Sequence, residues 1–341
     1  MKLKNFINTS VVADLLKKGS FKNGGGYRLL DCGVDFQMRN YDDFMKTKYG
    51  RFEEMMGIDT KQYRDYLEKH IPQAVHMDLN IATYPGLYEP YAMYPPEIFQ
   101  KYARLLGISR SDHIVLYGRQ RIAGMMVPCR ISWLFKVEIS MQFFLQYYGH
   151  GAVSVLDGGL TAWEDDGGEI TGEIQEVTVS EIYCDPNTTL KPGNWRADLC
   201  PDYIITYEQL IEKDSNGMNM FDKADQINFF DSRPRDQFKG KVDTMLDPKR
   251  VSGSRVPGTK CAPAVEMINE KGRLKDPDEL KSWLQKCGFK QDLPVISQCL
   301  RGIQACLLNS VIEDLFPFLR PRVYHGSCFE LQTRDPKRIC E

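Results

Sequence analysis

The hydrophobic pattern of the chain alternates short apolar runs with longer segments in which apolar residues recur every three or four positions. Apolar runs over 28–32 and 228–232 each predict a short buried strand. Helical periodicity begins at Pro96 and at Pro277, each followed by an acidic residue, which is a favoured start for a helix. Both halves of the chain therefore predict a buried strand followed, further along, by an amphipathic helix.

The two halves continue in the same order. The predicted helices end near Gly107 and Gly288, since glycine is common just after a helix. Apolar runs over 114–117 and 294–297 predict a second buried strand in each half, and each enters a polar, glycine-containing loop before another apolar helix. Strands that alternate with helices favour a mainly parallel sheet with helices on both faces, so the expected fold class is α/β.

This internal repeat predicts two tandem domains within the 341 residues. The N-terminal domain is expected over 1–168 and the C-terminal domain over 204–341. The segment 169–203 contains Asn, Thr, Pro and Gly without sustained periodicity, so we interpret it as a linker. One large α/β domain with similar halves is the alternative that the pattern leaves open.

Composition narrows the possible functions without selecting one. Hydrophobic residues make up 42% and charged residues 26%, and the formal net charge of −2 gives no general attraction to nucleic acid or to an anionic membrane. No apolar run reaches the roughly 18 residues that a membrane span requires. Residues 1–18 lack the pattern of a secretory signal, so the cytoplasm is the expected compartment, with mitochondrial import as the open alternative.

The cysteines favour thiol chemistry over structural roles. There are ten, without a CxxC pair and far apart in the sequence, so no metal site is predicted. In a chain without a secretory signal, they are expected to be thiols rather than a disulfide framework.

Candidate chemistry lies in the loops that follow the second predicted strand of each half, because ligands of open α/β sheets bind where strands end. The loop 118–124 contains no nucleophile, whereas the loop 298–304 contains Cys299 and, two residues later, Arg301. Backbone N–H groups of such a loop and of the following helix can converge on a sulfur anion. On pattern alone, Cys299 is either a reactive thiolate or a buried loop thiol. A cysteine-phosphatase loop fits poorly, because Ala305 stands where those loops need arginine.

Several short motifs follow one another in a defined order along the chain. The most specific is VSVLDGGLTAW over 153–163, and the second half adds FDSR over 230–233, VPGT over 256–259 and YHGS over 324–327. Together with the Cys299 loop they resemble the rhodanese superfamily, specifically its tandem-domain sulfurtransferases acting on thiosulfate or 3-mercaptopyruvate. The resemblance covers nearly the whole chain and implies two rhodanese-like domains, of which the first is non-catalytic.

The resemblance implies a two-step sulfur transfer. Cys299 would attack the outer sulfur of a small anionic donor, hold it as a persulfide, and pass it to cyanide, a thiol or a protein thiol. No metal or organic cofactor is implied, and neither nucleic acid nor a membrane is an expected partner. The anion would be stabilised by the loop that follows the cysteine, formed by Leu300, Arg301, Gly302, Ile303 and Gln304.

Substrate-binding candidates come from the same comparison. Mercaptopyruvate-type relatives use two arginines for the donor carboxylate; the nearest match to one is Gln237, with Arg235 two positions earlier, and the other corresponds to Lys249 or Arg250. Because Gln237 would weaken carboxylate recognition while Arg301 supplies a cation, thiosulfate is the favoured donor.

The chain also departs from the family pattern. Leu300 and Gln304 match neither the thiosulfate-type nor the mercaptopyruvate-type loop, and Asn80 replaces an acidic residue of the first domain. These departures motivate an alternative hypothesis, a catalytically degenerate rhodanese-fold protein that binds anions or docks a partner without turnover.

Overall fold

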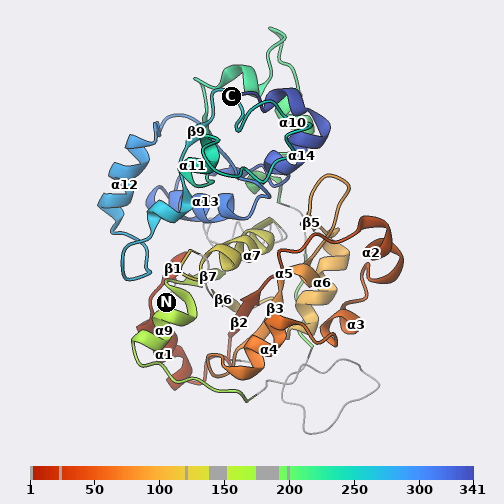
Figure 1. The fold of residues 1–341 in the computed structure, drawn as a ribbon. Coiled ribbons are helices and arrows are strands. Elements are labelled where there is room, and N and C mark those ends of the chain that lie inside the picture. Colours follow the sequence, from red (N-terminus) through yellow and green to blue (C-terminus); the bar gives the residue numbers. More distant parts are fainter. Residues whose placement is uncertain (1–2, 23–24, 120–121, 138–151, 174–191, 198–199) are drawn as a thin grey trace. The chain divides into compact units, whose positions relative to one another are not determined.

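The computed structural model describes the chain except for residues 1–2, 23–24, 120–121, 138–151, 174–191 and 198–199 (Figure 1). The chain divides into two compact units. The first contains Met1–Pro85 and Tyr91–Cys200, and the second contains Pro201–Glu341 together with the short segment Gly86–Pro90. The predicted linker, 169–203, lies for the most part outside the described residues.

Each unit contains a sheet in which all neighbouring strands are parallel, as the alternation of strands and helices predicts. In the first unit the order is β1 (Phe6–Ile7), β7 (Val153–Leu156), β6 (His113–Gly118), β2 (Tyr27–Gly33) and β3 (Val75–Asp78). In the second unit the order is β11 (Arg322–Val323), β10 (Val295–Gln298), β8 (Asn228–Asp231) and β9 (Lys260–Cys261). A small antiparallel pair, β4 (Thr83–Tyr84) and β5 (Ala92–Met93), stands apart from both sheets.

Helices connect the strands of both sheets. The described helices of the first unit are α1 (Thr9–Lys17), α2 (Tyr41–Thr47), α3 (Phe52–Met56), α4 (Lys61–Glu68), α5 (Leu79–Ala82), α6 (Pro96–Leu105), α7 (Met126–Val137) and α9 (Gly159–Asp165). Those of the second unit are α10 (Tyr207–Ile211), α11 (Arg235–Phe238), α12 (Pro277–Lys286), α13 (Gln304–Leu315) and α14 (Ser327–Arg334), with short 3₁₀ turns at Pro201–Tyr203, Met220–Lys223, Ala264–Met267 and Pro336–Arg338.

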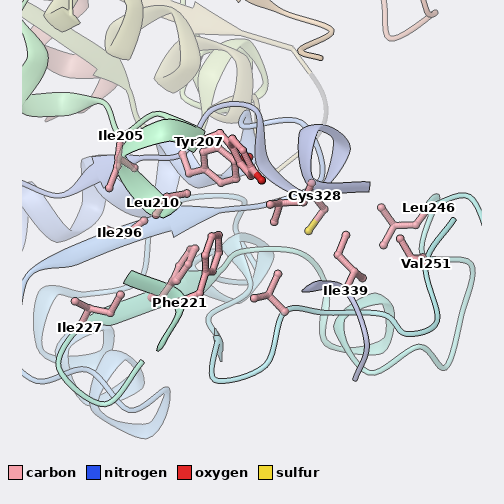
Figure 2. Packing of buried hydrophobic residues seen from close by; sticks show 14 residues of the cluster. Ile205, Tyr207, Leu210, Phe221, Ile227, Leu246, Val251, Ile296, Cys328 and Ile339 are labelled. Atoms are coloured by element: carbon pink, nitrogen blue, oxygen red, sulfur yellow. The ribbon is translucent and has the colours of Figure 1, made fainter. Parts of the chain in front are cut away.

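Both faces of each sheet are covered, because successive side chains of a strand point to opposite faces. Leu29 and Leu30 on β2 are each 0% exposed, and Phe229 and Phe230 on β8 are 1% and 0% exposed. On one face of the second sheet, Phe229 belongs to a hydrophobic cluster that also contains residues of α10, β10 and α14 (Figure 2). Phe230 on the opposite face stacks on Phe289, which follows α12. The predicted α/β sandwich is therefore confirmed.

The internal repeat seen in the sequence is also a repeat of topology. Strands β6, β2 and β3 are neighbours in this order in the first sheet, and β10, β8 and β9 are neighbours in the same order in the second. The helices predicted to begin at Pro96 and Pro277 begin there. Gly107 and Gly288, two residues beyond these helices, have left-handed φ angles of 70° and 85°, which glycine adopts without strain.

Candidate active site

Cys299 is the first residue after β10, and the loop that it opens leads into α13. The N-cap residue of α13, Ile303, makes no side-chain capping hydrogen bond. In the part of the chain that the structure describes, the N–H groups of Leu300, Gly302 and Gln304 donate to no protein acceptor. The loop therefore combines unfilled N–H donors with the positive end of a helix dipole, an arrangement that stabilises an anion.

Gly302 allows this loop to turn back against the chain before α14. Its φ is +74°, and a Cβ at this position would lie 2.3 Å from the carbonyl oxygen of His325. No side chain fits at such a distance from the backbone. Glycine is thus required here both by the left-handed conformation and by the close approach.

Hydrogen bonds join the same loop to the start of α14. The N–H of Cys299 donates to Ser327 Oγ at 3.1 Å. The N–H of Cys328 donates to the carbonyl oxygen of Cys299 at 3.1 Å, and the N–H of Phe329 donates to that of Leu300 at 2.9 Å. Two segments almost thirty residues apart in the sequence are therefore held together at Cys299.

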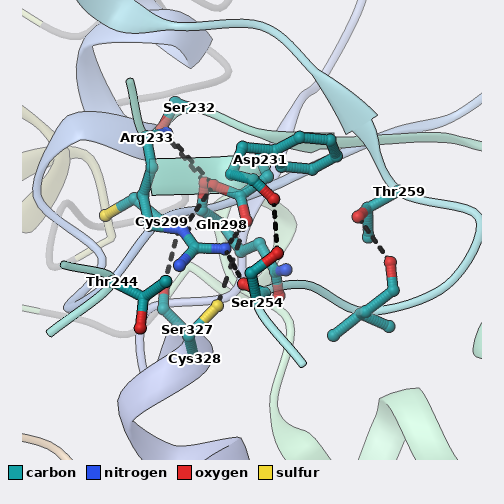
Figure 3. Close-up of polar contacts among 12 residues, drawn as sticks. Asp231, Ser232, Arg233, Thr244, Ser254, Thr259, Gln298, Cys299, Ser327 and Cys328 are labelled. Atoms are coloured by element: carbon teal, nitrogen blue, oxygen red, sulfur yellow. Dashed lines mark hydrogen bonds and ion pairs between the residues drawn. The ribbon is translucent and has the colours of Figure 1, made fainter. Parts of the chain in front are cut away.

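A buried ion pair lies beside Cys299. Asp231 ends β8 and is the register partner of Gln298, the residue before Cys299. Both Asp231 and Arg233 are 0% exposed, and Arg233 donates through Nη2 to the Asp231 carboxylate at 2.7 Å and to the carbonyl oxygen of Ser254 at 2.8 Å. Figure 3 shows Cys299, Ser327 and Cys328 gathered around this pair. Arg233 thus ties the end of β8 to the segment that contains Ser254.

The electrostatics of this pair depend on its neighbours. Burial alone would lower the pKa of Arg233, but the nearby Cys328 thiol and the Asp231 carboxylate raise it, so the guanidinium stays charged. A fixed buried cation close to two thiols lowers the free energy of any sulfur anion formed among them.

The remaining residues of the predicted loop lie in different surroundings. Ile303 is 4% exposed, and Leu300 packs against the hydrophobic cluster of the second unit. Arg301 is partly buried, with Cζ 5.9 Å from the centre of the Phe329 ring. The side-chain oxygen of Gln304 is buried and has no hydrogen-bond partner among the described residues. Cys299 itself is only 2% exposed, which favours a small reaction partner over a bulky one.

Arg235, a predicted substrate contact, is held by an acidic neighbour. Its guanidinium binds Glu266 through Nε at 2.5 Å and Nη2 at 2.7 Å, and Trp283 Nε1 donates to the same carboxylate at 2.9 Å. The hydrogen bonds to Glu266 raise the pKa of Arg235. Its charge is therefore compensated within the protein, and binding a donor carboxylate would require exchange of this partner.

Of the other predicted substrate contacts, Gln237 is partly buried, and Lys249 and Arg250 are exposed. Gln237 Nε2 donates to the carbonyl oxygen of Asp243 at 3.3 Å. Lys249 is exposed, and Arg250 pairs with Asp247 at 3.3 Å and donates to Thr333 Oγ1 at 3.2 Å. Exposed pairs of this kind contribute little, so these side chains can change partner at small cost.

Sequence reasoning missed two residues of this site. Ser327 was part of the YHGS motif, but its hydrogen bond to Cys299 could not be predicted. Cys328, the next residue, carried no signal of its own. Only the docking of α14 against the loop brings both residues to Cys299.

The first unit has a different residue at the equivalent position. Arg119 directly follows β6, as Cys299 follows β10. Its guanidinium pairs with Asp31, two residues before the end of β2, and donates to the carbonyl oxygen of Lys69. The two side chains are 17% and 2% exposed. The place of the nucleophile is thus taken by an ion-paired cation.

A pocket of about 410 Å³ opens at the same end of this first sheet. Its lining includes Asp31, Asp35, Lys61, Gln62 and Arg119. Gly33 also lines it, two residues after Asp31, where the second unit has Arg233 two residues after Asp231. A Cβ on Gly33 would lie 2.9 Å from the Gln62 Cβ, so this position accepts only glycine without a shift.

The described residues supply no sign of metal binding or membrane insertion. Among them, no group of three or more His, Cys, Asp or Glu side chains is placed to hold a metal ion. No described helix combines the length and the apolar character needed to cross a bilayer. The described cysteines are all free thiols, as expected.

Comparison with known proteins agrees with this geometry. Residues 49–166 match the model of the rhodanese-like domain. The chain is 37% identical over 345 residues to a putative thiosulfate sulfurtransferase of Caenorhabditis elegans, covering 100% of this chain and 98% of the relative. The chain belongs to the rhodanese family of sulfurtransferases. It is also 28% identical over 253 residues to human 3-mercaptopyruvate sulfurtransferase, covering 74% of this chain and 72% of the human protein.

Solved structures show the same tandem rhodanese fold. The Tum1 protein of Saccharomyces cerevisiae superposes with a TM-score of 0.69 at 17% identity, covering 100% of this chain and 99% of Tum1. The 3-mercaptopyruvate enzyme SseA of Escherichia coli gives a TM-score of 0.66 at 20% identity, covering 95% of this chain and 99% of SseA. The expected rhodanese fold is therefore confirmed.

We predict that Gly302→Ala destabilises the second unit more than Gly217→Ala. Gly217 has a similar φ of +77° with nothing within 4 Å of an added Cβ, so it reports the left-handed strain alone, about 1–2 kcal/mol. Gly302→Ala adds the collision with His325, worth a further cost of roughly 1–3 kcal/mol. Urea unfolding of both variants measures the difference, and equal losses would contradict the close approach.

We predict that Arg233→Met lowers the free energy of unfolding by about 3–5 kcal/mol, because it leaves the buried Asp231 charge unpaired. The double variant Asp231→Leu/Arg233→Met removes both charges and should recover much of this loss. Urea unfolding of the single and double variants tests the prediction. A double variant no more stable than Arg233→Met would show that the pair contributes through its shape rather than its charge balance.

Proposed function

We propose that this protein transfers sulfane sulfur through a persulfide on Cys299, with thiosulfate as its preferred donor. The observation that carries the proposal is the position of Cys299 between a strand end and an uncapped helix start, within a chain of the rhodanese family. The unfilled N–H groups of the loop support the proposal, since both a thiolate and a persulfide need such donors.

The transfer has two steps. In the first, the Cys299 thiolate attacks the outer sulfur of thiosulfate; a bond forms between the two sulfur atoms, the old sulfur–sulfur bond breaks, and its electron pair leaves with sulfite. In the second, a thiophilic acceptor such as cyanide, a thiol or a protein thiol takes the outer sulfur and the thiolate is restored. Neither step needs a metal or an organic cofactor.

The choice of thiosulfate rests on the cations of the second unit. Arg235 is compensated by Glu266, and Gln237 carries no charge, so a carboxylate donor finds little in this region to bind it. Arg301 brings a positive charge into the loop that follows Cys299. A positive charge in this loop favours a donor whose own charge lies next to the transferred sulfur, and the proposed preference is therefore for thiosulfate over 3-mercaptopyruvate.

The first unit is proposed to be non-catalytic. Arg119 stands where a nucleophile would be needed, and its guanidinium is committed to Asp31 and to the backbone of Lys69. The expected compartment is the cytoplasm, although one relative from Arabidopsis thaliana carries a name that places it in mitochondria.

Cys299→Ala is expected to abolish formation of thiocyanate from cyanide with either donor, with a loss of at least about a thousandfold, because the attacking sulfur is removed. Cys306→Ala is the matched control, since Cys306 is a buried thiol of α13 whose S–H is directed to the carbonyl oxygen of Gly302. Colorimetric detection of thiocyanate measures both variants.

Two outcomes would contradict the proposed function. Activity that survives Cys299→Ala would remove this residue from the mechanism. A wild-type chain that binds thiosulfate but gains no sulfur on Cys299, measured by intact mass after exposure to each donor, would instead support the degenerate binding protein.

Gln237→Arg is expected to raise kcat/KM for 3-mercaptopyruvate by roughly tenfold, the effect of one added charge-assisted hydrogen bond to the donor carboxylate. The same change should leave kcat/KM for thiosulfate within about twofold, because that donor has no distal carboxylate. Steady-state kinetics with both donors give the ratio. An equal rise for both would show a general charge effect and contradict the proposed role of position 237.

A further inference from the structure

Cys328 is a buried thiol beside Cys299 that the proposed transfer does not use. It is 0% exposed and lies on α14 directly after Ser327, whose hydroxyl accepts from the Cys299 N–H. Its own thiol is directed to Asp231 Oδ2 at 3.9 Å. Cys328 therefore belongs to the hydrophobic cluster of the second unit and lies at the edge of that cluster next to the Cys299 loop.

The backbone brings the two cysteines within reach of a covalent bond. The hydrogen bond from the Cys328 N–H to the Cys299 carbonyl oxygen is 3.1 Å long. With standard bond lengths, this contact places the two Cα atoms at most roughly 7 Å apart. Disulfides span Cα separations of about 4.4–6.8 Å, so the pair is compatible with one.

We propose that Cys328 resolves the Cys299 persulfide when no external acceptor is present, releasing hydrogen sulfide and closing a Cys299–Cys328 disulfide. The proposal rests on the proposed function, since it needs a persulfide on Cys299. In this role Cys328 is a second reacting thiol, and the Cys299–Cys328 disulfide is an oxidised form of the enzyme that persists until a reductant is present.

The step balances without an added oxidant. The Cys328 sulfur attacks the inner sulfur of the persulfide, a new bond joins the two cysteine sulfurs, and the bond to the outer sulfur breaks. The outer sulfur leaves with the electron pair and takes up the Cys328 proton, so that it departs as hydrogen sulfide. The sulfane sulfur is reduced and the two cysteines are oxidised. A dithiol, either a small molecule or a protein, then reduces the disulfide and restores both thiols.

Two features make this step slower than transfer to a small acceptor. Burial raises the pKa of Cys328 to about 12, with Arg233 opposing the rise and Asp231 adding to it, so the thiol is protonated at neutral pH. In Figure 3 the two sulfur atoms also point to different sides, so one side chain must change rotamer before they can bond. Attack of Cys328 on the persulfide therefore competes only when the concentration of external sulfur acceptors is low.

The test follows a single turnover without acceptor. Reduced, desalted wild-type chain and Cys328→Ser are mixed with thiosulfate in the absence of oxygen, and Cys129→Ser, another cysteine that is 0% exposed, is the matched control. Sulfide is measured over time, and non-reducing peptide mapping by mass spectrometry locates persulfides and disulfides. We expect the wild type and Cys129→Ser to release sulfide equal to the amount of chain and to form the Cys299–Cys328 disulfide.

Cys328→Ser should keep its persulfide and release sulfide at least roughly tenfold more slowly. A wild-type persulfide that lasts as long as that of Cys328→Ser would overturn the role of Cys328 and leave the proposed function intact. Absence of a persulfide in every protein, including Cys328→Ser, would overturn both. If Cys328→Ser does not fold, the peptide map of the wild type decides alone, because a persulfide that decays without a Cys299–Cys328 disulfide contradicts the proposal.

Discussion

The close approach of the Cys299 loop to the chain before α14 is the constraint on which the site depends. Gly302 turns against the carbonyl oxygen of His325, and hydrogen bonds from Cys328 and Phe329 hold the first two residues of the loop. These bonds use carbonyl oxygens of the loop, and the N–H groups of Leu300, Gly302 and Gln304 donate to no acceptor among the described residues. A loop held from its carbonyl side can offer its donors to an anion without losing its shape.

The buried Asp231–Arg233 ion pair lies next to this loop. A fully buried ion pair is a weak source of stability, since desolvation of both charges offsets most of their attraction. The pair instead fixes the position of the Arg233 guanidinium, which also binds the carbonyl oxygen of Ser254 and lies beside two thiols. The first unit uses the same strand end differently: Arg119 pairs with Asp31, and Gly33 leaves the space of a pocket. One topology thus holds the candidate nucleophile in one copy and an ion-paired cation in the other.

The proposed choice of sulfur donor depends on which cations already form ion pairs within the protein. Arg235 and Glu266 form a two-point contact, whereas Lys249 and Arg250 remain on an exposed turn. Among the described residues, the loop after Cys299 therefore offers N–H donors, whereas the charge of Arg235 is compensated by Glu266. This distribution supports the proposed preference for a small donor with its charge close to the sulfur.

The sequence by itself determined the architecture and singled out Cys299 as the candidate nucleophile. The repeated order of apolar strands, helix starts at Pro96 and Pro277, and glycines after the helices predicted two α/β units, because these signals are local. Cys299 could be selected because a strand end followed by a helix start is visible in sequence. The ion-pair partners of charged residues could not be predicted in this way. Arg235 binds Glu266 and Arg119 binds Asp31, and in each pair the two residues lie far apart in the sequence.

Only the tertiary structure decided what surrounds the Cys299 sulfur. Ser327 and Cys328 lie next to Cys299 because α14 packs against the loop, and no local pattern records the distance between segments joined only through the core. The requirement for glycine at 302 has the same origin, since the carbonyl that excludes a side chain belongs to His325. Periodicity and turn chemistry act over a few residues, whereas contacts between folded segments are set by packing of the whole unit.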